Sequence, residues 1–357
     1  MLTAQQINQI QELQSTGINS KTLVKGQLDL IFKNNWFNIW VPKSFNGLEL
    51  SFTDGLRLLE ELAYWDAGFA WTITLCAGAN MFVGFINPDL AKELWEDPKV
   101  CFGGSGKIGG KAIMDGDDYI ISGSWNYATG APHLTHFTLN AEIIIEDNSW
   151  ESKSVDPIHY SFFVPKEQVL IHYDWDSFGL ECTASHSFSL NNVRVSKEHA
   201  FILDPEFKTN LSPLFRIPFL PFAQLTLFMN YAGMFRRFLD LMEKYYFEKS
   251  KDPVWSKEFS KIRFKELDEV QILIEKEVIQ IIELSKTLWE MAVNSLVIDK
   301  MLSHEIENAT KKAVKIIREK TVHLFPYAGI RAAQKENELN IVFRNLFTAT
   351  QHSLLNI

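Results

Sequence analysis

The spacing of hydrophobic residues changes twice along the 357-residue chain. Up to about residue 99, apolar side chains such as Leu56 and Leu59 recur every three or four positions, which is typical of amphipathic helices. Between about 100 and 205, apolar and polar residues alternate and glycines interrupt them, which is typical of strands. The helical spacing then returns. We therefore expect an α+β protein with an N-terminal α-helical domain (1–99), a middle β domain (100–205) and a C-terminal four-helix bundle (206–357).

Residues that favour helix ends refine this expectation. Ser51 or Thr53 can cap one helix, and Asp66 can begin the next. The longest apolar stripe runs from 257 to 301, and an unbroken helix of that length would extend roughly 65 Å at 1.5 Å per residue. We expect this helix to bend or break near Asn294 or to contact a second subunit.

Strand candidates in the middle of the chain are short, rich in β-branched and aromatic residues, and bounded by turn-forming residues. They are residues 119–121, 137–145, 160–164, 170–173, 186–190 and 193–195. The stretch 119–131, YIISGSWNYATGA, is predicted to be a hairpin with a tight turn at Ser122 and Gly123.

Three side chains in the second half of this stretch, Trp125, Tyr127 and Thr129, suit a planar ligand. Aromatic faces supply stacking area, and a hydroxyl can hydrogen-bond to ring heteroatoms. We expect Tyr127 and Thr129 to contact the ligand and Trp125 to face away. Residues two apart share a face of a strand, so this arrangement requires the Gly130 end to curl under the ligand. The alternative is that all three residues pack in a sheet core.

Composition and charge exclude several classes of function. The chain is 46% hydrophobic and carries a net charge of −9 with scattered Lys and Arg, which argues against nucleic-acid binding. Cys76, Cys101 and Cys182 are odd in number and lack metal-type spacing, which argues against a disulfide framework and a zinc site. The start of the chain has no leader pattern, and no apolar run approaches 18 residues. We expect a cytoplasmic protein that does not bind a membrane.

Two motif matches lack the context that they need. Residues 104–109 satisfy the dinucleotide-binding fingerprint, but a glycine pair and a strand follow in place of the required helix. His133 and His136 are three apart in an extended segment and would point to opposite faces, so we expect no metal site.

The α, β, α order and four segments together resemble the acyl-CoA dehydrogenase superfamily. The segments are EELAYWDAGFAWTI (60–73), GSWNYATGA (123–131), WDSFGLECTASHSFSLNNVRV (175–195) and FRNLFTATQH (343–352). The resemblance covers nearly the whole chain. It implies a flavin cofactor, a β-barrel as the middle domain, and a bundle that packs subunits into a homodimer or homotetramer.

The resemblance also implies a flavin site. Tyr127 resembles the aromatic residue against the isoalloxazine ring, and Thr129 resembles the hydroxyl near the reactive nitrogen of that ring. The other flavin-binding residues that it implies are Ser105, Trp175, Thr183 and Ser185.

The branch of the superfamily is indicated by a missing base. Acyl-CoA dehydrogenases need a carboxylate to remove a substrate proton. The expected position falls at or near Ser353, and no acid occurs between 222 and 239. The chain is instead similar to two-component flavin monooxygenases, which take reduced FMN or FAD from a separate reductase. That branch implies His352 and Thr129 as catalytic residues.

We therefore expect a flavin-dependent oxidoreductase that uses reduced flavin and O2 on a small apolar substrate. One alternative is an enzyme that oxidises a CoA thioester with FAD, and another is a catalytically degenerate accessory protein on the same scaffold. Glu181 stands where this branch has a basic residue, and its carboxylate would repel a flavin phosphate. His352 would continue a polar stripe with Asn345 and Thr348 on the last helix, where a surface histidine is the alternative.

Overall fold

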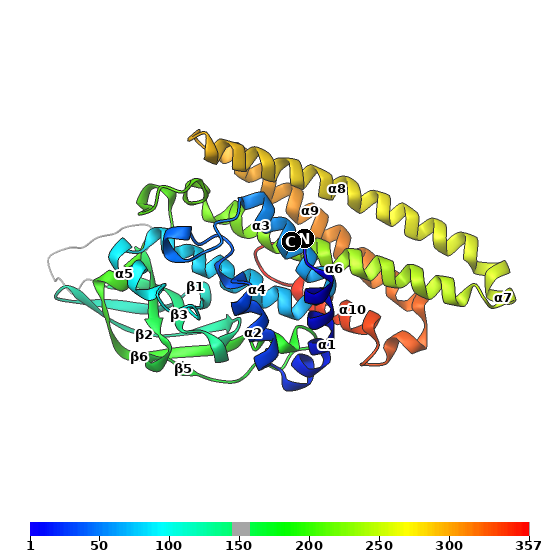
Figure 1. Cartoon of the computed structure of the whole chain (residues 1–357), viewed down its shortest axis with the longest axis horizontal. Coiled ribbons are helices and arrows are strands. Elements are labelled where there is room, and N and C mark those ends of the chain that lie inside the picture. Colours follow the sequence, from blue (N-terminus) through cyan, green and yellow to red (C-terminus); the bar gives the residue numbers. More distant parts are fainter. Residues whose placement is uncertain (145–157, 357) are drawn as a thin grey trace.

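The computed structural model describes residues 1–144 and 158–356. Helices come first, strands follow, and long helices close the chain (Figure 1). The first helices are α1 (Ala4–Ser20), α2 (Lys25–Lys33), α3 (Phe52–Trp65), α4 (Ala67–Asn80) and α5 (Pro88–Leu94). The last are α6 (Phe219–Lys249), α7 (Pro253–Trp255), α8 (Lys261–Val293), α9 (Lys300–Leu324) and α10 (Glu338–Ala349). The types of element thus change where the apolar spacing changes, while the exact domain boundaries stay predictions.

Helix α4 is the buried centre of the N-terminal part. The segment Ala67–Phe85 is long and apolar enough to cross a membrane, but 83% of its most apolar window is buried inside the protein. A helix that is apolar all round is typical of a core position, and burial accounts for this composition. The predicted cap is confirmed, because the Asp66 carboxylate accepts hydrogen bonds from the backbone N–H groups of Gly68 (3.0 Å) and Phe69 (3.1 Å).

The Asp66 cap makes stability depend on pH. Burial raises the pKa of Asp66 to about 6, although the two backbone hydrogen bonds oppose the shift. Because the folded state holds this proton more tightly than the unfolded chain, the stabilisation is complete below about pH 4 and is lost as the pH rises through about 6. We expect Asp66→Asn, which keeps a capping oxygen, to gain on the order of 2–3 kcal/mol relative to wild type between pH 4 and pH 7. Urea unfolding at both pH values measures this, and a constant difference would contradict it.

The strands form one seven-stranded sheet in the order β5-β6-β2-β1-β3-β4-β7. They are β1 (Phe102–Asp115), β2 (Asp118–Ala128), β3 (His136–Ile144), β4 (His159–Pro165), β5 (Leu170–Ile171), β6 (His186–Ser196) and β7 (Ala200–Phe201). Strands 186–190 and 193–195 of the prediction are one strand, and Ile145, the predicted end of another, lies outside the described residues. Because β5 and β7 are the edges of this sheet, its closure into a barrel stays a prediction.

The predicted turn at Ser122 and Gly123 is wrong. Strand β2 runs through both residues, and the hairpin turn lies between Asp115 and Asp118, where Gly116 has a φ of 65°. A Cβ atom at Gly123 would lie 2.5 Å from the Cα atom of Gly110 on β1. Gly123 therefore permits the close approach of a neighbouring strand. Close approach of a ligand, the other common reason for a glycine inside a strand, is not its role here.

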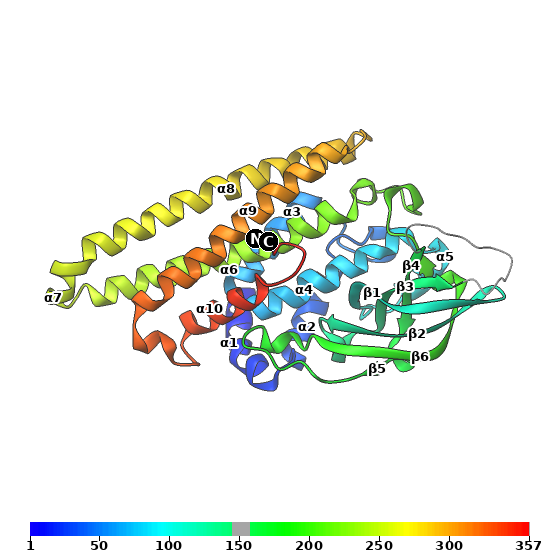
Figure 2. The same cartoon turned by 180° about the vertical axis from the view of Figure 1, so that it is seen from behind.

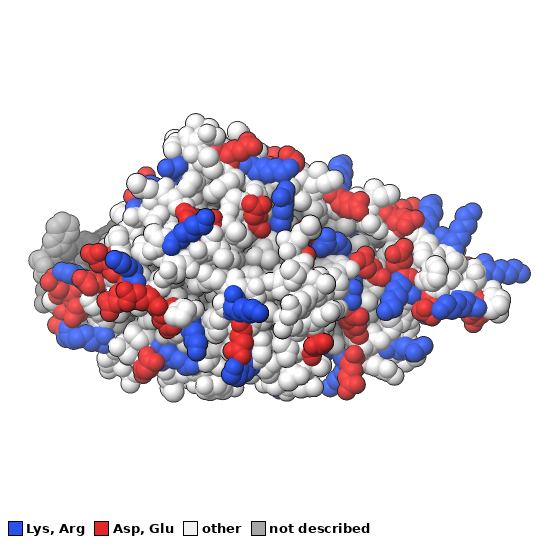
Figure 3. Space-filling view, in the orientation of Figure 1, with Lys and Arg blue, Asp and Glu red and all other residues white. Residues whose placement is uncertain are grey.

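The C-terminal bundle lies beside the sheet domain. Helix α6 packs against α3, α4 and α9, and α8 lies along the outside of the bundle (Figures 1 and 2). The predicted break near Asn294 is confirmed, because α8 ends at Val293 with Asn294 as its C-cap and Ser295 has a φ of 56°. At 1.5 Å per residue, its 33 residues extend about 50 Å. Acidic and basic side chains are interspersed over the face in Figure 3.

Candidate functional site

A β-bulge decides where the aromatic side chains of β2 point. Trp125 pairs with Phe188 and Ala128 pairs with His186, so three steps on β2 match two steps on β6. The extra residue is accommodated at Tyr127, which has a φ of 67°. Trp125 is consequently 1% exposed while Tyr127 is 64% exposed. The bulge separates these side chains, whereas the prediction relied on a curl at Gly130.

Trp125 is a core residue. Its ring stacks on Phe188 with 5.3 Å between centroids, and its Nε1–H donates to the backbone oxygen of Asn140 at 3.0 Å. Both the apolar ring and its one donor are therefore satisfied within the protein.

Tyr127 forms the exposed part of an aromatic surface. Its ring lies edge-on to Trp175, with 6.2 Å between centroids. Trp175 is fixed from two sides, because its Nε1–H donates to the oxygen of Leu180 (3.2 Å) and its backbone N–H donates to Nδ1 of His186 (2.9 Å). A fixed ring beside an exposed one offers stacking area to a planar ligand.

Three buried hydroxyls lie behind this surface. The Oγ1 atom of Thr129 lies 2.9 Å from the Oγ atom of Ser185, which lies 2.8 Å from Oγ1 of Thr183. The backbone N–H of Gly130 also donates to the oxygen of Thr183 at 2.8 Å, which fixes the end of β2 to this loop. Three hydroxyls carry three O–H donors, and the hydrogen bonds among them use two. Within the described part of the chain these hydroxyls bond only to one another, so one donor is left for a ligand.

Helix α10 contacts the loop that carries Thr183 and Ser185. The guanidinium of Arg344 pairs with Glu181 and donates from Nη1 to the backbone oxygen of Phe178 at 2.8 Å. Oδ1 of Asn345, predicted to lie on a polar helix face, is buried and accepts from the N–H of Leu180 at 2.7 Å. The Glu181 carboxylate is thus paired and presents little net charge, so we expect it to repel a flavin phosphate less than the sequence alone suggests.

His352 is not on the last helix. Helix α10 ends at Ala349, so the predicted helical stripe through Thr348 and His352 is wrong. The imidazole lies edge-on to Trp71 of α4, with 6.0 Å between ring centroids. Its Nδ1 accepts a hydrogen bond from the N–H of Leu354 at 3.3 Å, so the neutral ring carries its proton on Nε2. Burial lowers the pKa of His352, and the Lys107 cation lowers it further.

Ser105 lies on a bulge of β1. Gly104 pairs with Thr138 and Ile108 with Asn140, so β1 has two extra residues in this step. The same bulge carries Lys107, a cation that lowers the pKa of His352.

The structure thus brings the predicted residues together in two groups, the three hydroxyls and the Tyr127 and Trp175 pair, while His352 lies against Trp71 and Ser105 lies on the β1 bulge. Lys107, Trp71 and Arg344 were missed by the sequence analysis. Lys107 lies in the glycine-rich segment GSGKIGG, and Trp71 and Arg344 lie in segments quoted for the resemblance, but none of the three was assigned a role. The roles of all these residues toward a flavin stay predictions.

Comparisons with known proteins find monooxygenases among the relatives of this chain. No family model matches the chain. The indole-3-acetate monooxygenase of Acinetobacter baumannii is 24% identical over 206 residues, which are 57% of this chain and 51% of that protein. The flavin-dependent monooxygenase oxygenase subunit HsaA of Mycobacterium tuberculosis is 22% identical over 210 residues, which are 56% and 51% of the two chains. The chain thus spans about half the length of the curated relatives that it matches.

Solved structures match over nearly the whole chain. The crystal structure of HsaA from M. tuberculosis superposes with a TM-score of 0.89 at 16% identity, covering 98% of this chain and 92% of that one. XiaF from a Streptomyces species, in complex with FADH2 and glycerol, gives a TM-score of 0.84 at 18% identity and covers 99% and 92%. The chain therefore has the acyl-CoA dehydrogenase-like fold of these monooxygenases, and its relatives include an indole-3-acetate monooxygenase and the oxygenase subunit of a flavin-dependent monooxygenase.

Proposed function

We propose that the chain is the oxygenase of a two-component, flavin-dependent monooxygenase. It would use reduced FMN or FAD and O2 to oxygenate a small apolar substrate. The observation that carries this proposal is the exposed Tyr127 ring beside the buried chain of three hydroxyls with one spare donor. This arrangement combines stacking area and a hydrogen bond at adjacent positions, as an isoalloxazine ring requires.

The described residues fit a flavin. Tyr127 and Trp175 would hold the face of the ring, and Thr129 would offer a hydroxyl whose direction Ser185 and Thr183 fix. The bulge with Ser105 would complete the wall. When bound, reduced flavin supplies the two electrons that oxygen activation needs.

His352 would hold a proton at the edge of this site. Because Nδ1 is already occupied by the N–H of Leu354, Nε2–H is the free donor of the neutral ring. Burial and the Lys107 cation keep the imidazole neutral near pH 7, so it can steady a developing negative charge by donating one hydrogen bond. Trp71 covers this ring on the α4 side, which limits the access of water.

The substrate class follows from relatives and from the apolar interior. The names of the relatives refer to indole-3-acetate and p-hydroxyphenylacetate, and one matching structure holds FMN and indole. The interior faces of α4 and α6 are lined mostly by apolar side chains. We infer a small, predominantly apolar aromatic substrate for this chain.

The partners follow from the same scheme. Several relatives are named as oxygenase subunits or components, and a separate reductase would supply the reduced flavin. A second copy of the chain fits the outer face of α8, where Ile262, Ile272 and Ile279 are 61%, 68% and 62% exposed. Large apolar side chains exposed on one helix are typical of a subunit interface, and a homodimer or homotetramer would bury them. The reducing, cytoplasmic location stays part of the proposal.

The experiment that tests the function is incorporation of oxygen from ¹⁸O2. The chain would be mixed with indole-3-acetate, indole and p-hydroxyphenylacetate while an unrelated NADH-dependent reductase supplies reduced FMN or FAD. We expect a hydroxylated product that contains one ¹⁸O atom, as a monooxygenase inserts one atom of O2 and reduces the other to water. Reactions without the chain are the control. Oxidation of an acyl-CoA with no ¹⁸O in any product would contradict the proposal.

A further inference from the structure

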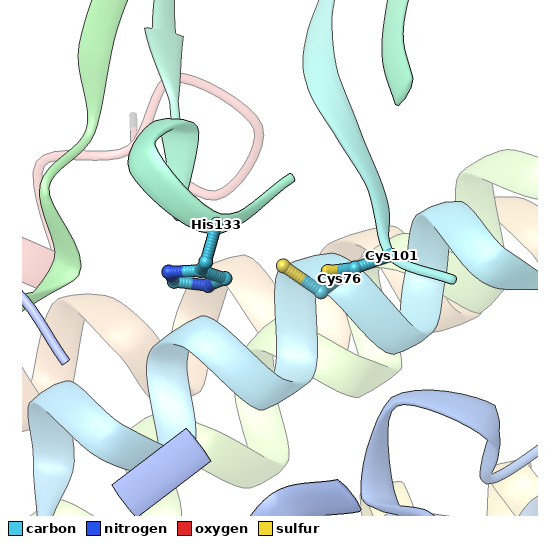
Figure 4. Close-up of side chains that lie close together, drawn as sticks. All are labelled: Cys76, Cys101 and His133. Carbon is cyan, nitrogen blue, oxygen red and sulfur yellow. The ribbon is translucent and has the colours of Figure 1, made fainter. Parts of the chain in front are cut away.

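Three side chains with metal-binding atoms meet behind the turn that carries Thr129. Cys76 comes from α4, Cys101 immediately precedes β1, and His133 ends the short helical turn Ala131–His133 (Figure 4). Their ligand atoms, two sulfurs and a ring nitrogen, all lie within 4.8 Å of one another. Both cysteines are fully buried. The sulfur of Cys76 points toward the imidazole ring in Figure 4.

The imidazole of His133 is the unexplained member of this cluster. Both of its ring nitrogens are buried and have no hydrogen-bond partner among the described residues. An unsatisfied buried polar atom costs about 1–3 kcal/mol. The Phe37 ring stacks on the imidazole with 5.9 Å between centroids and offers no acceptor. Burial and the Lys166 cation lower the pKa of His133 to about 4, so the ring is neutral and keeps a lone pair for a ligand.

We propose that Cys76, Cys101 and His133 bind a thiophilic divalent cation, for which zinc is the fitting ion. Zinc bonds of about 2.3 Å to sulfur and 2.0 Å to nitrogen place tetrahedral ligand atoms about 3.5–3.8 Å apart, so the widest pair needs to close by about 1 Å. Rotation of the two cysteine side chains supplies such a movement. The backbone oxygen of Thr129, 3.9 Å from the sulfur of Cys76, is the nearest further ligand atom in the contacts of these sulfurs.

The charge of the proposed complex suits a buried site. Binding replaces two thiol protons, which pass to solvent, and two thiolates then neutralise the two positive charges of the ion. A neutral complex avoids the cost of an isolated buried charge, and the nearby Lys166 neither repels nor attracts it strongly.

A disulfide between the two cysteines is the competing chemistry. Burial raises the pKa of Cys101 well above its usual range, and its hydrogen bond to Cys76 raises it further. Both thiols are fully buried, so oxidants have poor access to them. A metal overcomes the raised pKa because bond formation to the ion accompanies the loss of each proton.

The ion would serve as a structural link. It would connect α4, the start of β1 and the turn after Gly130, and would thereby fix the backbone on both sides of Thr129. This inference does not depend on the proposed function, because the cluster lies behind the hydroxyl chain and not on the exposed Tyr127 side.

Metal analysis of the full chain tests the inference. The protein would be produced in zinc-containing medium, purified without a chelator or polyhistidine tag, passed over chelating resin and measured by plasma mass spectrometry. We expect about one zinc ion per wild-type chain. Cys101→Ser and His133→Asn should each lower the content at least tenfold. Cys182→Ser is the matched control, because Cys182 is equally buried but lies outside the cluster.

Cobalt reconstitution of the wild-type chain keeps the test valid if a variant fails to fold. We expect visible bands of tetrahedral cobalt and a thiolate-to-cobalt absorption in wild type and in Cys182→Ser. A wild-type chain with less than a tenth of an equivalent of metal and no cobalt bands would overturn the inference. So would an intact mass lower by two hydrogen atoms, which indicates a disulfide, or full metal content in Cys101→Ser.

Discussion

Replacing His352 with alanine should lower the rate of product formation by about 10²- to 10⁴-fold while changing the affinity for reduced flavin by less than about threefold. The expected loss is large because Nε2–H of this half-buried ring is the donor left over once Nδ1 accepts from Leu354, and it would stabilise the negative charge that develops in the reaction. The affinity for reduced flavin should persist because Tyr127, Trp175 and Thr129 would hold the flavin ring, and His352 would not. Stopped-flow mixing of the reduced-flavin complex with oxygen and substrate measures both quantities. His304→Ala is the control, since His304 is an exposed histidine on α9.

The pH dependence gives this prediction a second readout. Burial and then Lys107 lower the pKa of His352, so the neutral form persists below the ordinary range of histidine, and activity should fall only on the acid side of that range. Lys107→Met removes one repulsion, raises the pKa of His352, and should move the acid limb of the rate profile to higher pH. Lys107→Arg should leave it in place. An unchanged rate in His352→Ala would place the histidine outside the reaction.

Replacing Trp125 with alanine should lower the free energy of unfolding by about 3–5 kcal/mol without changing the flavin affinity of the folded molecules. The ring is 1% exposed, stacks on Phe188 and donates a hydrogen bond to Asn140, and all of these contacts are lost in the variant. Trp125→Phe keeps the stack and should cost less. Urea unfolding and a reduced-flavin titration measure the two effects.

Tyr127 should behave in the opposite way. Its side chain is 64% exposed, so Tyr127→Asn should change the free energy of unfolding by less than about 0.5 kcal/mol. Asparagine tolerates the φ of 67° at this position, which keeps the bulge intact. Loss of a stacking ring should weaken flavin binding by at least about tenfold. Weaker binding in Trp125→Phe than in Tyr127→Asn would reverse the assignment of the two aromatic residues.

Local rules predicted much of the fold from the sequence. The cap at Asp66, the end of the long helix at Asn294 and the change from helical to alternating spacing all depend on neighbouring residues. The predicted turn at Ser122 and Gly123 was wrong because a glycine in such a pattern can mark either a turn or the close approach of a neighbouring backbone. Only the position of β1 shows that Gly123 faces a neighbouring backbone.

The candidate site was less accessible to sequence reasoning because its contacts are distant along the chain. Arg344 and Glu181 are separated by 163 residues, and their pairing neutralises the negative charge that the sequence placed at this loop. The three cysteines have no metal-type spacing, yet two of them meet His133 in the fold. The resemblance placed Thr129, Thr183 and Ser185 in one site, but their mutual hydrogen bonds and the spare donor are visible only in the structure.

The central claim is that the chain accepts reduced flavin on the surface formed by Tyr127 and the three hydroxyls. An anaerobic equilibrium titration with reduced and with oxidised FMN and FAD tests it most directly. The account predicts that one reduced flavin binds at least about tenfold more tightly than its oxidised form, a difference of about 1.4 kcal/mol, and that Tyr127→Asn and Thr129→Val both weaken this binding. Equal affinity for both forms, or a tightly held oxidised flavin that an acyl-CoA reduces, would contradict it.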